Sequence, residues 1–152
     1  MASSLLLRAA AFTAPFEGRR LDKYQDIRGT WTFGYGSLCE HYPDATFPVT
    51  EEFAQQCLAD YLKSSYKSVA RLITVPLNEN QIIALIDFCY NLGAGRLQSS
   101  TLRKKINRGV EDLESEFEKY SYAGGRWSRG LHARRVAEWQ LYSCPVVQQI
   151  SQ

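Results

Sequence analysis

The 152-residue sequence lacks paired cysteines and clustered histidines. Its four cysteines are far apart, none forms a CxxC pair, and the sequence shows no His-Cys ligand cluster. A zinc site needs such clusters, so no metal site is expected. The wide spacing favours a reducing cytoplasm over a disulfide scaffold, although one bridge after export stays open. Among the four, Cys39 is expected to be the exposed thiol, because it lies in a polar segment.

A long apolar run is also lacking. The N-terminal stretch MASSLLLRAAAFTAPF superficially resembles a signal peptide, but Arg8 interrupts it and it is too short to span a bilayer. We interpret it as the first helix of the fold, with an inner side formed by Leu5, Leu6, Ala9 and Phe12 or Phe16. Pro15 should end this helix just before Glu17. No stable membrane insertion is expected.

Strong net charge is the third absence. The formal charge is only +2, which does not indicate a nucleic-acid partner. Residues 119–135 nevertheless hold five basic residues and no acidic one. They predict either a solvated basic helix face or a surface that steers the protein to an anionic polymer such as a cell wall. Length and composition are those of one globular domain, residues 1–152.

The pattern along the chain predicts an α+β fold. Residues 24–48 carry turn formers and alternating β-branched or aromatic residues, which indicate a small antiparallel sheet. Thr50 is a good N-cap for a helix over residues 50–72. Asn78 and Gln81 form a capping-box pattern ahead of an apolar helix that should end at Gly93. Shorter helices are expected over residues 101–107, 111–120 and 131–142.

The segment FEGRRLDKYQDIRGTWTFGYG, residues 16–36, holds the best candidates for chemistry. Glu17 is followed by Asp26 nine residues later and by Thr32 six residues after that. Glycosidic-bond cleavage commonly uses two carboxyl groups, one protonated and one ionised. Glu17 lies beside apolar Phe16, which favours the neutral acid, whereas Asp26 lies in a polar turn. Two carboxyl groups in contrasting surroundings are typical of an acid/base pair.

Four segments in order resemble the phage-type lysozymes, glycoside hydrolase family 24. They are residues 16–36, the run VPLNENQIIALIDFCYNLGAGR from residue 75, the run SSTLR from residue 99, and the C-terminal YAGG, GL and RRxxE motifs. Together they cover residues 12–144, and several motifs in one order are far more specific than any one alone. Three places depart from the family pattern: Pro15 next to Glu17, Ser37, which stands where that family usually has histidine, and the loop of residues 38–48.

The resemblance implies a lysozyme-like fold with a small β-rich N-terminal lobe (24–48), a linking helix (50–72) and a larger helical lobe (78–144 plus the N-terminal helix). The active-site cleft would lie between the lobes. The implied activity is hydrolysis of the β-1,4 bond between N-acetylmuramic acid and N-acetylglucosamine in peptidoglycan. Glu17 would protonate the leaving oxygen, while Asp26 and Thr32 would activate water. No cofactor is implied.

The same resemblance suggests four substrate-binding residues: Tyr35, Gly36, Arg134 and Arg135. Tyr35 fits a sugar platform or a turn aromatic equally well, and burial is the simpler interpretation of Trp127 and Trp139. The expected partner is bacterial peptidoglycan, bound by a monomer made in a host cytoplasm and acting on the periplasmic wall during phage release.

Three alternatives stay open at this point. A lytic transglycosylase would cut the same bond without water. A catalytically inactive module would bind the wall only. A small helical nucleic-acid binder would use residues 119–135.

Overall fold

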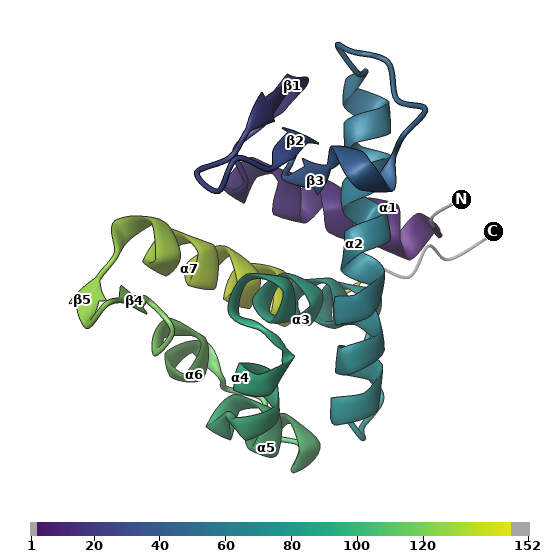
Figure 1. Cartoon of the computed structure of the whole chain (residues 1–152). Helices are drawn as coiled ribbons and strands as arrows, with labels where there is room; N and C mark the ends of the chain where they lie inside the picture. Colours follow the sequence, from purple (N-terminus) through teal and green to yellow (C-terminus); the bar gives the residue numbers. More distant parts are fainter. Residues whose placement is uncertain (1–2, 147–152) are drawn as a thin grey trace, which may run out of the picture. The chain divides into compact units, whose positions relative to one another are not determined.

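The computed structural model describes residues 3–146 and divides into two compact units, Met1–Ser64 and Ser65–Gln152 (Figure 1). The first unit holds a three-stranded sheet, and the second is mainly helical. The elements of the first unit are α1 (Ser4–Thr13), η1 (Ala14–Phe16), β1 (Arg20–Gln25), β2 (Trp31–Gly34), β3 (Ser37–Leu38), η2 (Cys39–His41) and the start of α2 (Glu51–Leu72).

The first helix ends as the sequence predicts. The Ser3 hydroxyl accepts a hydrogen bond from the Leu6 N–H and caps α1. Pro15 lies in the first turn of η1, where its missing N–H costs nothing, and the α-helix stops at Thr13. Glu17 is therefore the first extended residue after the helical segment.

The strands β1, β2 and β3 form one antiparallel sheet in that order, which confirms the predicted small sheet (Figure 1). β1 begins at Arg20, four residues before the predicted start, because its first half is charged and gave no apolar signal. The core of this unit is the Phe33 ring, which is fully buried. It packs against three aromatic rings at centroid distances of 5.4–6.1 Å: Tyr42, Phe47 and Phe53.

Both predicted caps of the longer helices are confirmed. The Phe53 N–H donates to Thr50 Oγ1 over 3.1 Å at the start of α2. The helix α3 (Glu79–Leu92) opens on a capping box in which Asn78 and Gln81 exchange two 2.9 Å hydrogen bonds. Over residues 3–146 no helix combines the length and the apolar character needed to cross a membrane.

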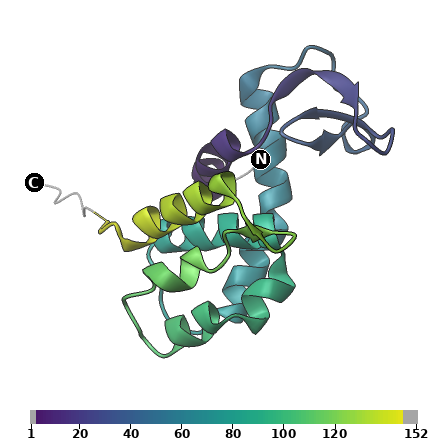
Figure 2. The same cartoon turned by 90° about the vertical axis from the view of Figure 1, so that its left-hand side faces the viewer.

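In the second unit, α3 packs beside the C-terminal helix (Figure 2). Aromatic rings of α3, α6 and α7 meet in the core, where Phe117 lies 6.0 Å from Phe88 and 5.6 Å from Tyr142. The elements after α3 are α4 (Ala94–Ser99), α5 (Thr101–Asn107), α6 (Glu114–Glu118), β4 (Tyr122–Ala123), β5 (Arg126–Trp127) and α7 (Arg129–Ser143).

Three details of this unit differ from the sequence-based expectations. The helix α4 and the β4–β5 hairpin were not predicted, and α6 is shorter than the predicted 111–120 because Leu113 has a non-helical backbone. All four cysteines are free thiols, but the exposed one is Cys144, while Cys39 is half-buried. The expectation for Cys39 was therefore wrong: the residue begins the short helix η2 instead of lying in an open loop.

A buried carboxylate ties α5 to α6. Glu116 is buried and accepts hydrogen bonds from Lys105 over 2.6 Å and Lys119 over 2.7 Å. These two ammonium donors lower the pKa of Glu116 below its ordinary 4.5. The stabilisation is therefore fully present above about pH 4.5 and is lost as the pH falls through the lowered pKa of the folded state.

We expect Glu116→Gln to lower the free energy of unfolding by about 1–2 kcal/mol at pH 7, discounted because both lysines are partly exposed. At pH 3 the difference from wild type should shrink markedly, since the carboxylate is then being protonated. Urea unfolding at the two pH values measures this. Glu118→Gln, on the same helix, is the control. An equal deficit at both pH values would contradict the assignment.

Candidate functional site

Glu17 borders a hollow of about 320 Å³ in the first unit. Its backbone N–H donates to the Ala14 carbonyl over 3.1 Å, and its side chain is half-buried. Pro15 and the polar side chains of Arg19, Tyr35 and Gln55 line the same hollow. Pro15, which departs from the family pattern, thus forms part of the wall beside this carboxyl group.

Asp26 closes the turn between β1 and β2. Its Oδ1 accepts the Arg28 N–H over 2.8 Å and the Thr30 N–H over 2.9 Å. The Gly29 N–H donates to the Asp26 carbonyl, and Gly29 has a φ of 81°, which a glycine adopts without strain. The predicted Asx-turn role is therefore confirmed. In residues 3–146, Oδ2 of Asp26 accepts no hydrogen bond from another residue, so this oxygen is available to water.

Thr32 lies opposite Tyr24 in the β1–β2 register. Its hydroxyl donates to the Thr30 carbonyl over 2.9 Å, and only 4% of the residue is exposed. Cross-strand partners share one face of a sheet, so Thr32 lies on the face of Tyr24, and Asp26 follows in the turn two residues after Tyr24. Because its proton is committed to Thr30, the Thr32 oxygen can act only as an acceptor toward a nearby water.

The turn after β2 contains Gly34, Tyr35 and Gly36. A Cβ on Gly34 would lie 3.2 Å from the Ala54 Cβ, so this glycine allows the turn to approach α2. Only 8% of Tyr35 is exposed, and its hydroxyl donates to the Glu51 carboxylate. Tyr35 thus shows a clear packing role, and sugar contacts by Tyr35 and Gly36 stay predictions.

Glu51 holds three side chains around the Glu17 hollow. Besides Tyr35, it binds Arg19 Nη1 at 3.0 Å and Gln55 Nε2 at 3.2 Å. The tyrosine hydrogen bond lowers the pKa of Glu51, whereas burial and this carboxylate raise the pKa of Tyr35. The sequence showed Glu51 only as a first-turn acid of α2, and nothing linked it to a tyrosine sixteen residues earlier.

Glu51→Gln should lower the pKa of Tyr35 toward its ordinary 10.0 but not fully, because burial is the larger cause of the shift. The amide oxygen still accepts the hydroxyl hydrogen bond, while the negative charge is gone. An NMR titration of ring-labelled tyrosine measures the change, and Glu52→Gln on the exposed neighbouring acid is the matched control. An unchanged Tyr35 titration would show that Glu51 does not govern this hydroxyl.

The two candidate arginines belong to α7. Arg134 forms a two-pronged ion pair with Asp87 of α3, at 2.9 and 2.8 Å. Arg135 binds Glu138 Oε1 at 2.8 Å and Asn91 Oδ1 at 2.7 Å, and its exposed fraction is 0%. A substrate contact by Arg134 stays a prediction. The position of Arg135 indicates a structural role, because a guanidinium without exposed surface cannot meet a polymer.

The prediction of a solvated basic helix face over residues 119–135 was wrong for three of its five basic residues. Arg134 and Arg135 are buried against carboxylates, and Lys119 is paired with Glu116. Of the five basic residues in this stretch, only Arg126 and Arg129 are exposed and have no ion-pair partner in the described part of the chain. A nucleic-acid interface would need a larger free positive surface.

Two further residues singled out in the sequence, Ser37 and His41, lie in the sheet-containing unit. Ser37 is buried, and its hydroxyl has no partner within residues 3–146. His41, to which no role was assigned, places Nδ1 2.6 Å from the Tyr61 hydroxyl, which also accepts the Leu38 N–H. These contacts join η2 and β3 to α2. In the same part of the chain, no three His, Cys, Asp or Glu side chains are grouped to hold a metal ion.

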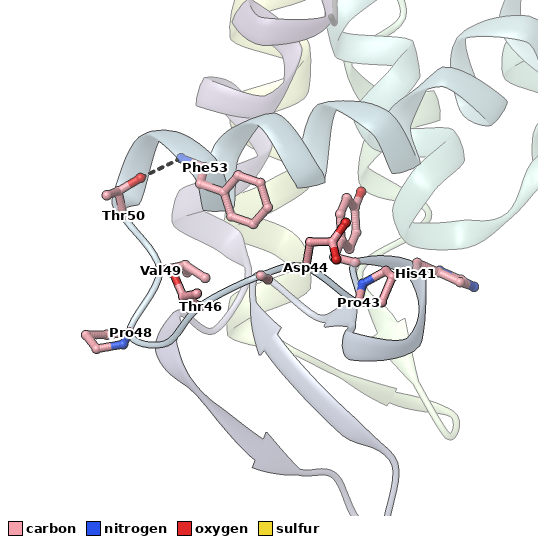
Figure 3. Close-up of a pocket in the computed structure, with 10 residues that line it drawn as sticks. His41, Pro43, Asp44, Thr46, Pro48, Val49, Thr50 and Phe53 are labelled. Atoms are coloured by element: carbon pink, nitrogen blue, oxygen red, sulfur yellow. Dashed lines mark hydrogen bonds between the residues drawn. The ribbon is translucent and has the colours of Figure 1, made fainter.

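A larger hollow of about 500 Å³ lies under the loop between η2 and α2 (Figure 3). His41, Asp44 and Phe53 are among the residues that line it, while the Thr50 hydroxyl is engaged as the cap of α2. None of the catalytic or substrate-binding candidates lines it. Volume alone therefore does not locate the site, and the smaller hollow at Glu17 fits the sequence-based candidates better.

Comparisons with known proteins identify the family of this chain. Residues 14–138 match the phage lysozyme family, and the chain belongs to it. The endolysin of Bacillus phage B103 is 35% identical over 133 residues, which cover 84% of this chain and 49% of that protein. The endolysin of Acyrthosiphon pisum secondary endosymbiont phage 1 is 35% identical over 132 residues, covering 84% of this chain and 89% of that protein.

Among solved structures, the muramidase domain of SpmX from Asticaccaulis excentricus matches with a TM-score of 0.76 and 26% identity. The match covers 95% of this chain and 99% of that domain. The predicted lysozyme-like α+β fold is therefore confirmed. The chain spans about half the length of the first curated relatives that it matches, 49% and 54%.

Proposed function

We propose that this chain is an endolysin-type muramidase that hydrolyses the β-1,4 bond between N-acetylmuramic acid and N-acetylglucosamine in peptidoglycan. The observation that carries the proposal is the β1–β2 hairpin, which has the Asp26 carboxylate in its turn and the Thr32 hydroxyl in β2, each with a free acceptor position. Glu17, beside its hollow, supplies a second carboxyl group. Membership of the phage lysozyme family supports the same activity.

In the proposed reaction, Glu17 gives its proton to the glycosidic oxygen as the bond from the anomeric carbon to that oxygen breaks. A water donates one hydrogen bond to Asp26 and one to Thr32, which directs an oxygen lone pair at the anomeric carbon. The water oxygen bonds to that carbon and its proton passes to Asp26. Proton transfer from Asp26 back to Glu17 through solvent restores the starting state.

Product analysis tests this proposal. Isolated cell walls are digested in ¹⁸O-water, and the released muropeptides are analysed by mass spectrometry. Hydrolysis gives reducing ends carrying one ¹⁸O atom. A lytic transglycosylase gives 1,6-anhydro sugars without ¹⁸O, and an inactive wall-binding module gives no products. Either of the last two results would overturn the proposal.

The setting is proposed on the same grounds. The protein would be made in the host cytoplasm, act as a monomer on the periplasmic wall, and serve host lysis. Two of the curated relatives are named endolysins of phages, which supports this setting. Tyr35 and Gly36 are proposed to contact the sugar at the edge of the Glu17 hollow, where Tyr35 already forms part of the lining.

Thr32→Val should reduce the hydrolysis rate about tenfold, because one hydrogen bond that orients the water is lost while the β-branched shape is kept. Thr32→Ser retains the hydroxyl and should keep most of the activity. Initial rates of muropeptide release measure both. Equal rates for Thr32→Val and wild type would refute a water-positioning role and leave Thr32 as a strand residue only.

A further inference from the structure

The β4–β5 hairpin presents two aromatic side chains on a rigid support. Its two-residue loop, Gly124 and Gly125, has φ values of 57° and 78°. Two consecutive positive φ values are the mark of a type I′ turn, which matches the twist of the flanking strands. Tyr122 and Trp127 are direct cross-strand partners. Their side chains therefore lie next to each other on one face of the hairpin.

Both aromatic residues are exposed: 56% of Tyr122 and 55% of Trp127 lie open to solvent. The expected burial of Trp127 was therefore wrong, because the short hairpin turns its ring away from the helical core. The Trp127 ring lies 5.4 Å from the His132 ring of α7, which supports it from one side. Adjacent exposed aromatics of this size are a common sign of a binding surface.

The exposed, unpaired cations of residues 119–135 lie in the hairpin and just after it. Arg126, in the hairpin, and Arg129, at the start of α7, are exposed and have no ion-pair partner in residues 3–146. The stretch from Lys119 to Arg135 contains no acidic residue that could neutralise them. Arg126 pairs with Ala123, so its side chain leaves the hairpin on the face opposite the two rings. The hairpin and the start of α7 therefore offer two aromatic rings on one face and two available guanidinium groups nearby.

We propose that Tyr122 and Trp127, with Arg126 and Arg129, form a second peptidoglycan contact outside the Glu17 hollow. The aromatic rings would stack on the C–H faces of the sugar rings, and the arginines would pair with carboxylates of the peptide stems. This inference rests on the proposed function, since it takes the same polymer as ligand. Its effect is to retain the protein on the insoluble wall between successive cuts.

The charge of the face favours a glycan over a nucleic acid. A polyphosphate partner is bound mainly through several cations at once. Here two of the five basic residues of the stretch are buried and a third is paired with Glu116, which leaves two. Two aromatic rings with only two arginines near them suit a polymer whose sugars are neutral and whose carboxylates are widely spaced.

Binding to purified sacculi tests the contact, with every protein carrying Glu17→Gln so that the polymer stays intact. In sedimentation assays we expect Trp127→Ala to weaken the apparent Kd about tenfold and Tyr122→Ala by a similar or smaller factor. Trp127→Phe should retain most of the affinity, and Trp127→Leu should bind as poorly as Trp127→Ala. Val110→Ala, another exposed apolar position in this unit, is the control.

Unchanged binding by both alanine variants would overturn the contact, as would equal loss in Val110→Ala. A Trp127→Leu protein that binds like Trp127→Phe would show a plain hydrophobic effect and overturn the stacking. A parallel titration with single-stranded DNA should give weak binding, and tighter binding to DNA than to sacculi would also overturn it. Failure of the proposed function is distinguishable, because it appears as absent ¹⁸O products from the protein with Glu17 intact, whatever the sacculus affinity.

Discussion

Glu17→Gln is expected to slow the lysis of isolated cell walls by about 10²–10⁴-fold, the usual cost of losing a general acid. Glutamine keeps the shape and the hydrogen-bonding capacity of the side chain but cannot release a proton to the leaving oxygen. The hollow at Glu17 should therefore stay formed, with Tyr35 and Arg19 still held by Glu51. Turbidity loss of isolated walls, which removes the outer-membrane barrier, measures the rate.

Two controls make this result specific. Glu52→Gln, the same substitution on an exposed acid of the first unit, should lyse walls at the wild-type rate. Circular dichroism and thermal unfolding of Glu17→Gln should match wild type within about 1 kcal/mol, since a single partly exposed substitution seldom costs more. A folded Glu17→Gln protein that lyses walls at a rate near wild type would reject Glu17 as the acid.

The sequence predicted best those features that are set by neighbouring residues. The caps at Thr50 and Asn78 and the Pro15 helix end are local, because a cap binds backbone groups within three residues. The Asx turn at Asp26 is equally local. Each was read from a short motif, and the structure shows the corresponding hydrogen bonds.

Long-range pairing was missed for the opposite reason. Arg134 meets Asp87 across 47 residues of sequence, so the arginines could be read only as a basic helix face. Glu51 likewise binds Arg19 across 32 residues. Nothing in a helical period tells which charged residue is buried, since that depends on the partner helix. The candidate acid/base residues could be identified from the sequence because they lie close together in one segment.

The β4–β5 hairpin is a different case, because its signal was present. Two aromatic residues flank a Gly-Gly pair, a recognised two-residue turn pattern. Strands of two residues are too short to show alternation, so no strand was predicted here. Trp127 was then assigned to the core by its hydrophobicity alone, although a residue after such a turn can equally face solvent.

The buried charges of α7 should have the largest effect on stability. Arg135 and Glu138 are both 0% exposed, and the guanidinium also lies 5.4 Å over the Phe88 ring. Burial raises the pKa of Glu138 well above its ordinary value, against the opposing attraction of Arg135. If either Arg135 or Glu138 were removed, the charge of the other would stay buried without solvent to stabilise it.

Glu138→Ala should lower the free energy of unfolding by about 3–5 kcal/mol, because it leaves the Arg135 guanidinium buried without its nearest carboxylate. That is a large share of the roughly 5–15 kcal/mol typical of a folded domain. Glu138→Gln should cost less, since the amide oxygen still accepts the Arg135 hydrogen bond and burial already disfavours the charged carboxylate. Urea unfolding followed by circular dichroism, with the midpoint and slope compared, measures each value.

The double variant Arg135→Met with Glu138→Leu separates the pair from its surroundings. If the cost of Glu138→Ala arises from the stranded charge, the apolar double variant should be more stable than either single variant, because no buried charge remains. The Asn91 side chain and the Tyr120 carbonyl lose their guanidinium donor in both Arg135 variants, so the single Arg135→Met protein is the matched reference. A double variant as unstable as the sum of the two single changes would show that Arg135 and Glu138 stabilise α7 independently.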